Sequence, residues 1–145
     1  MVTLRELVVA GAALALLPFA LRAQDGAGVL IVYVEGIETA DGQILVELFD
    51  SADAFMSEPA FSEALAAEED ADFRVRFENV PPGEYAVFAW HDVDGDGELR
   101  RGLFMGGPKE PVGFSNDARF DFAPPQFAEA AFRIDTGLNE VIIRF

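Results

Sequence analysis

The acidic segment at residues 92–99 carries the side chains best suited to chemistry. Its sequence is DVDGDGEL, with carboxylates at its first, third and fifth positions and glycine at its sixth. Carboxylates on alternate residues of a curling chain converge on one point, and a glycine permits the sharp turn that this requires. The spacing therefore predicts a DxDxDG calcium loop with the ligands Asp92, Asp94, Asp96 and Glu98.

The rest of the segment departs from a complete EF-hand. Its ninth position is Arg100 and its twelfth is Leu103, where an EF-hand has a bidentate glutamate, and no helical pattern follows. Calcium would need ligands from elsewhere, and the nearest candidates are Asn116, Asp117 and Asp121, of which we expect Asp117 to be a ligand. The alternative is a solvated turn without an ion, because alternating Asp and Gly residues are also ordinary turn chemistry.

The chain has one histidine, His91, directly before this segment. A lone histidine excludes zinc sites built from several histidines, and any Ser-His-Asp mechanism would have to use it. We expect its imidazole to hydrogen-bond loop backbone at a strand end, and the alternatives are a part in an ion or ligand site or in catalysis. No paired nucleophile and base is evident, so we predict that the protein is not an enzyme.

The N-terminal segment has the layout of a secretory signal peptide. Residues 7–21 form an apolar run of 15 residues, shorter than the roughly 20 that a spanning helix needs. We predict a signal peptide at residues 1–23, cleaved after Ala23, and the alternative is a retained N-terminal anchor. Residues 24–145 would then form one domain, exported to the periplasm or the extracellular space and not embedded in the membrane once the signal is cleaved.

The net charge of the chain narrows the choice of partners. The full chain has 26 acidic and 10 basic residues, a net charge of −16, and no cysteine. Such acidity argues against nucleic acid and anionic lipid, and favours solubility or cation binding. Stability must come from packing because no disulfide is available.

The elements that position the acidic segment are strands. Residues 28–37 are apolar on both faces, residues 43–49 alternate, and the turn signal at 41–42 predicts that the two form a hairpin. Residues 72–78 alternate cleanly, as in a half-buried strand, and residues 85–91 are apolar on both faces.

Two further elements are expected around these strands. Phe61, Ala64 and Leu65 follow helical spacing and predict a short helix near residues 59–67. Residues 130–135 and 139–145 are expected to form a terminal hairpin. The whole pattern predicts an all-β, antiparallel β-sandwich of about seven strands with one short helix.

Several motifs carry a family resemblance. The phrase FENVPPGEY at residues 77–85 resembles the connection between two strands of prealbumin-like sandwiches. The motifs HDVDGDGEL, GPKEPVGFSN and PPQFAEA, beginning at residues 91, 107 and 124, resemble bacterial secreted proteins grouped as domain of unknown function 2141 (DUF2141). The resemblance implies an exported Ig-like or prealbumin-like sandwich with no established activity. Family members often have an acidic residue where Arg100 stands, and Arg100 and Arg101 could neutralise the acidic segment without a metal.

The long segment at residues 102–127 is either pinned by its own side chains or functional. The apolar side chains that could pin it are Phe104, Met105, Phe114, Phe120, Phe122 and Phe127. Alternatively, Lys109, Phe114 and Asn116 would line a shallow groove for a sugar or peptide.

These observations leave two main functions open. We expect an exported, non-catalytic, monomeric domain with a structural calcium ion, and the alternative is a carbohydrate- or peptide-binding module with a glycan or protein partner in the cell envelope. Hydrolases of the transthyretin-related type that act on a cyclic ureide resemble the fold, but they need several His and Arg residues and a C-terminal Tyr-Arg-Gly-Ser. This chain has one histidine and ends in VIIRF.

Overall fold

The computed structural model describes residues 26–68, 73–99 and 107–145, which form a β-sandwich. The predicted signal peptide at residues 1–23 lies outside these ranges. A 3-10 turn, η1 (Ser115–Asp117), and one short helix, α1 (Phe127–Ala130), accompany the strands. No helix in the described ranges is long and apolar enough to cross a lipid bilayer. The strands are β1 (Gly28–Glu35), β2 (Gln43–Phe49), β3 (Phe61–Ala66), β4 (Arg74–Val80), β5 (Gly83–Asp92), β6 (Val112–Phe114), β7 (Phe132–Ile134) and β8 (Gly137–Arg144).

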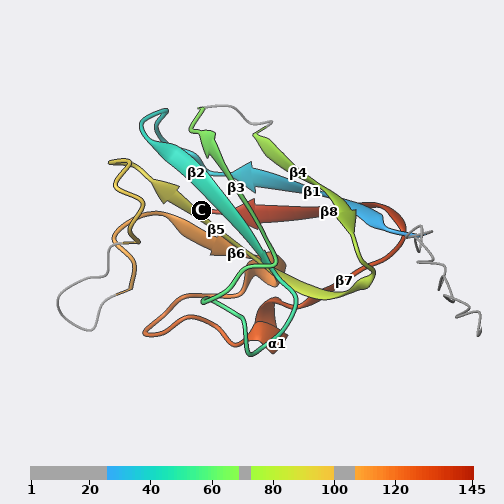
Figure 1. The fold of residues 1–145 in the computed structure, drawn as a ribbon. Coiled ribbons are helices and arrows are strands. Elements are labelled where there is room, and N and C mark those ends of the chain that lie inside the picture. The colour runs from blue at the N-terminus through green and yellow to red at the C-terminus, as the bar shows by residue number, and fades with distance from the viewer. Residues whose placement is uncertain (1–25, 69–72, 100–106) are drawn as a thin grey trace, which may run out of the picture.

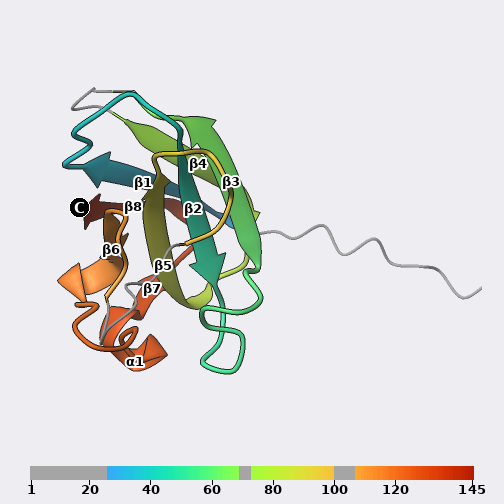
Figure 2. The same cartoon turned by 90° about the vertical axis from the view of Figure 1, so that its left-hand side faces the viewer.

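Two sheets face each other across the sandwich, as Figure 1 and Figure 2 show. One sheet has the strand order β4-β1-β8, and the other has the order β3-β2-β5-β6, with β7 pairing the start of β5. All pairs are antiparallel except β1 and β8, which run parallel from the pair Gly28–Gly137 to the pair Glu35–Arg144. The predicted all-β sandwich with one short helix is confirmed, with one parallel pair added to the antiparallel pattern.

The inner core is the layer of buried apolar side chains between the two sheets. Every second residue of β1 enters it, namely Leu30, Val32 and Val34. The half-buried strand predicted at residues 72–78 is confirmed in β4, where Val75 and Phe77 are buried and the alternating charged side chains are exposed. Burial of this layer is the main favourable contribution to folding.

The outer core is a second apolar layer, on the face of the β3-β2-β5-β6 sheet that points away from the sandwich. Its central residues are Phe49, Ala86, Phe88, Trp90, Phe114 and Ala130. β5 contributes side chains to both cores. Tyr85, Val87 and Ala89 point into the inner core, while Ala86 and Phe88, which lie between them, point into the outer core. The prediction that residues 85–91 are apolar on both faces is therefore confirmed.

The helix predicted near residues 59–67 is wrong, because residues 61–66 form the edge strand β3. Within β3 only Phe61 packs on the inner core, with the ring centroids of Phe61 and Phe77 6.1 Å apart, and Leu65 is 41% exposed. Ala67, directly after the strand, is also buried in the inner core. The helical spacing therefore marks no buried face, and a helix of nine residues is too short to be stable alone. Pairing with the backbone of β2 outweighs the local pattern, and the short helix of the fold is α1.

The two predicted hairpins are also wrong. β1 and β2 belong to different sheets, and so do β7 and β8. Gly137, with φ of +89°, lies at the change of sheet between β7 and β8, where the Asn139 side chain accepts from the N–H of Asp135 and donates to its carbonyl. Each strand joins the sheet that buries its apolar face, and turn residues in the sequence do not reveal whether the chain folds back or crosses over.

Gly113 is expected to tolerate no larger residue. β6 approaches β8 so closely that a Cβ at position 113 would lie 2.5 Å from Ile143 Cγ2 and 2.6 Å from the carbonyl oxygen of Arg144. We expect Gly113→Ala to lower the free energy of unfolding in urea by about 1–3 kcal/mol, as overpacking does. Gly107→Ala is the matched control, because the nearest atom there is 3.6 Å away. Equal stability of the two variants would contradict the close approach.

Candidate functional site

Asp92, at the end of β5, is the anchor of the acidic segment. The strand register places it opposite Gln43 of β2, and its side chain is fully buried. Its Oδ2 accepts hydrogen bonds from Gln43 Nε2 and from the N–H of Gly97, each at 2.9 Å. Its Oδ1 accepts from the N–H of Asp96 at 3.1 Å, so one carboxylate organises the whole turn.

The chain after Asp92 curls back over this carboxylate. Gly95 and Gly97 adopt φ of 71° and 75°, which a side chain would strain. Asp94 Oδ1 accepts from the N–H of Asp96 at 3.3 Å, and Asp96 Oδ1 accepts from the N–H of Glu98 at 2.8 Å. One carboxylate oxygen from each of Asp92, Asp94 and Asp96 lies within 4.8 Å of the other two, which is the clustering that the spacing predicts.

The hydrogen bonds to Asp92 favour its ionised form. Burial would raise the pKa of its carboxyl, but bonds from Gln43 and from the backbone N–H groups of Gly97, Gly95 and Asp96 together outweigh it and lower the pKa below its usual range. An ionised carboxylate has about four lone-pair sites. The four donors therefore account for the sites of Asp92, and the repulsion among the three close carboxylates favours a bound cation.

The other two predicted metal ligands lie outside this cluster. Glu98 is exposed, and it is joined to the cluster through its backbone N–H. Asp117 lies beside Arg144, whose Nη1 is 3.0 Å from its Oδ1. Ser115 bonds to Val87, five residues before Asp92, so η1 lies beside the middle of β5 and not beside the end that carries the cluster. Arg100, Arg101 and Leu103 are outside the described residues.

Two residues beside the acidic segment were missed by the sequence analysis. Gln43 holds the Asp92 carboxylate, and Glu110 Oε1 accepts from the N–H of Val93 at 3.3 Å. Gln43 could have been found from the pairing of residues 43–49 with 85–92, whereas Glu110 carries no local signal. A cavity of about 340 Å³ lies here, lined by Val93, Asp94, Lys109, Glu110 and Pro111.

The three predicted ligand-binding residues have different surroundings. Lys109 lines the cavity beside Asp94, whereas Phe114 is only 2% exposed and stacks on Phe88 with ring centroids 4.8 Å apart. The Asn116 side-chain amide donates to the Ala131 carbonyl at 2.7 Å, and its backbone adopts φ of 59°. Phe114 and Asn116 therefore have structural roles, and a ligand site formed by the three residues stays a prediction.

The packing explanation of the long segment fits its described part. Phe114, Phe120 and Phe127 belong to the outer core, while Phe122 is 81% exposed and pins nothing. Phe104 and Met105 lie outside the described residues.

A buried serine, which the sequence analysis also missed, ties this segment to the sheet. Ser115 is fully buried, its Oγ accepts from the N–H of Val87 at 2.9 Å, and it donates to the carbonyl of Ala130. One hydroxyl thus joins η1, β5 and α1.

His91 lies on the inward side of β5, next to Asp92. Its side chain is buried, and Nε2 lies 2.7 Å from the carbonyl oxygen of Asp41, which can only accept, so the ring nitrogen donates. The ring stacks on Phe145 with centroids 6.4 Å apart. The expected hydrogen bond from the imidazole to loop backbone is therefore present.

Together, the fold and the cluster define an all-β sandwich with a carboxylate-lined turn at the end of its most buried strand. The sequence profile of one family, described as an uncharacterized protein conserved in bacteria (DUF2141), matches residues 32–142. The chain therefore belongs to the DUF2141 family, as its motifs indicate. The comparison with curated proteins finds no match, and the comparison with solved structures finds none either.

The pKa of the Asp92 carboxyl is expected to lie below that of an ordinary aspartate, which carboxyl-detected NMR would measure directly. Because the pKa is lower in the folded than in the unfolded state, the ionised group stabilises the fold above the unfolded-state pKa. That stabilisation is lost as the pH falls through the folded-state pKa. Gln43→Ala removes the side-chain donor and should raise the pKa of Asp92, while the control Gln126→Ala should leave it unchanged. A pKa of Asp92 equal to or above that of the exposed aspartates in the parent protein would contradict this account.

Proposed function

We propose that this protein is an exported, non-catalytic domain that binds a structural calcium ion at the acidic segment. The observation that carries the proposal is the approach of three carboxylate oxygens, from Asp92, Asp94 and Asp96, to within 4.8 Å of one another. Ca²⁺ takes six to eight oxygen ligands, so waters or backbone carbonyls would complete the shell. The calcium ion would supply the positive charge that offsets the mutual repulsion of the cluster.

The expected affinity is weak. With only three carboxylates in the cluster, a Kd of about 10⁻⁴–10⁻³ M is appropriate, in the range of extracellular modules. A site of this affinity would be filled outside the cell and would stabilise the end of β5, since Asp92 belongs both to the strand and to the cluster.

Calcium is expected to raise the melting temperature. At about 5 mM Ca²⁺ this affinity corresponds to about 1–2 kcal/mol of added stability, or a shift of roughly 3–8 °C. Asp94→Ala combined with Asp96→Ala should abolish the shift, and a chelator should reverse it in the parent protein. Asp53→Ala combined with Glu63→Ala is the control, because it removes two exposed charges elsewhere. An unchanged melting temperature at this calcium concentration would refute the proposed site.

Export is supported by the apolar run at residues 7–21 and by the acidity of the chain. The protein is expected in the periplasm or medium of bacterial cells, with Gln24 as its first residue by mass spectrometry. Leu16→Arg should trap it uncleaved in the cytoplasm, because a charge interrupts the apolar run, whereas Leu16→Val should be exported normally. Equal export of the two variants would contradict the signal-peptide assignment.

The non-catalytic part of the proposal is supported by the surroundings of His91. Its imidazole is buried and bonded to a backbone carbonyl, so it is poorly placed to act as a base toward a substrate.

A second candidate function, a carbohydrate-binding module of the cell envelope, is favoured by a separate cavity that lies beside Arg144.

A further inference from the structure

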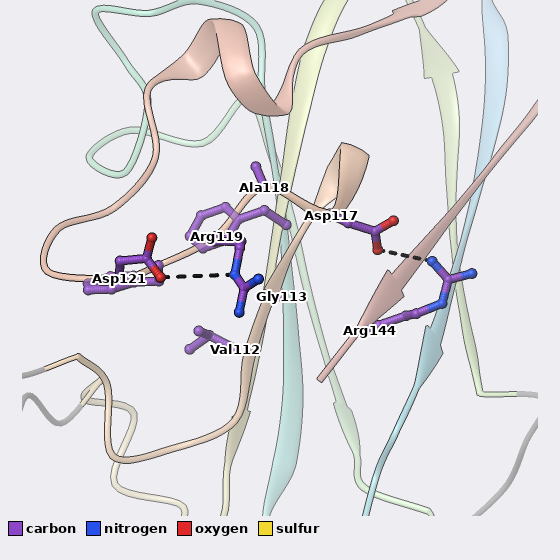
Figure 3. A pocket seen from close by; sticks show the side chains of 9 residues that line it. Val112, Gly113, Asp117, Ala118, Arg119, Asp121 and Arg144 are labelled. Carbon is purple, nitrogen blue, oxygen red and sulfur yellow. Dashed lines mark hydrogen bonds and ion pairs between the residues drawn. The ribbon is translucent and has the colours of Figure 1, made fainter.

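A cavity of about 300 Å³ lies at the seam between the two sheets, where β6 approaches β8. Its polar side chains are Arg119, Asp121, Asp117 and Arg144, and its apolar wall includes Val112 and Phe120. Figure 3 shows the Arg119–Asp121 pair and the Asp117–Arg144 pair on opposite sides of Gly113, with Val112 below the Arg119–Asp121 pair. Cavities of this size are at the lower end of the range for small ligands.

The two ion pairs are weak enough for a ligand to rearrange. Arg119 Nε and Asp121 Oδ1 are 3.9 Å apart, with side chains 84% and 73% exposed. Arg144 Nη1 and Asp117 Oδ1 are 3.0 Å apart, with side chains 51% and 66% exposed. Exposed ion pairs of this kind contribute little to stability, so exchanging them for bonds to a ligand carries little penalty.

The charges of this cavity balance. Two guanidinium groups can only donate hydrogen bonds, and two carboxylates can only accept them. An anionic ligand would meet the carboxylates and the −16 charge of the chain, and a cationic ligand would meet the guanidinium groups. A hydroxyl both donates and accepts, so neighbouring hydroxyls on one ligand can bridge an arginine and an aspartate.

The apolar wall is held in place by the outer core. Phe120 is half-buried, and its ring centroid lies 6.4 Å from that of Phe114. On the other side, Arg144 Nε is 3.1 Å from Glu35 Oε2, which fixes its stem while Nη1 faces Asp117. A ligand whose flat, nonpolar C–H face packs against Phe120 and Val112 would direct the hydroxyls at its edge toward the charged side chains.

We propose that this cavity binds an uncharged saccharide, with Arg119, Asp121, Asp117 and Arg144 hydrogen-bonding its hydroxyls and Phe120 contacting its ring. The size of the cavity limits the bound part to about one sugar ring. The proposal rests on the second candidate function and is independent of calcium, since none of these residues belongs to the carboxylate cluster.

The test is binding of the purified full-length protein to an array of uncharged, acidic and basic saccharides, followed by NMR titration with the best uncharged sugar. We expect amide shifts at Gly113 and at residues 117–121, with a Kd of about 1 mM, because a single ring has few atoms. Arg119→Ala and Asp121→Asn should each weaken binding at least about tenfold, a loss of 1.4 kcal/mol. Removing calcium should leave the affinity unchanged.

Arg133→Ala is the matched control. Arg133 and Asp135 form an ion pair with the same spacing in sequence as Arg119 and Asp121, and it lies outside the cavity lining. This variant should bind like the parent protein. The proposal is overturned if no uncharged saccharide binds, if acidic sugars bind more tightly, or if Arg119→Ala and Arg133→Ala bind equally well.

Discussion

The burial of β5 on both of its faces is the constraint on which the rest of the structure depends. A strand with apolar side chains pointing both ways needs a cover on each side, and the opposite sheet supplies only one. The outer cover comes from Phe55 in the loop after β2 and from residues 112–130. The stretch at residues 112–130 is therefore required for packing before it is required for function.

The motif GFSN within that segment is explained residue by residue. Gly113 allows β6 to touch β8, and Phe114 stacks in the outer core. Ser115 joins three elements through one hydroxyl, and Asn116 holds a left-handed turn against Ala131. The most specific family motif in the chain thus secures a cover over β5, and the polar groups suited to binding lie at its margins.

Local patterns predicted the strands well and their pairing poorly. Alternation at residues 72–78 depends only on which side chains meet the core, so it is visible in the sequence. The separation of β1 from β2 depends on which sheet offers a partner, which no local pattern contains. The same limit applies to the candidate site. The local spacing of Asp92, Asp94 and Asp96 brings their carboxylates together as expected. Asp117 was chosen because it is near in sequence, but the pairing of β6 with β5 places it away from these carboxylates.

The parallel pairing of β1 with β8 has a consequence for the order in which the chain folds. Their first pair joins Gly28 to Gly137, so β1, the middle strand of its sheet, has only β4 beside it until almost the whole chain is available. Closing so long a loop is slow compared with pairing adjacent strands. Until β8 pairs with β1, the backbone groups along one edge of this apolar strand are unpaired. The chain is therefore most prone to aggregation during this interval.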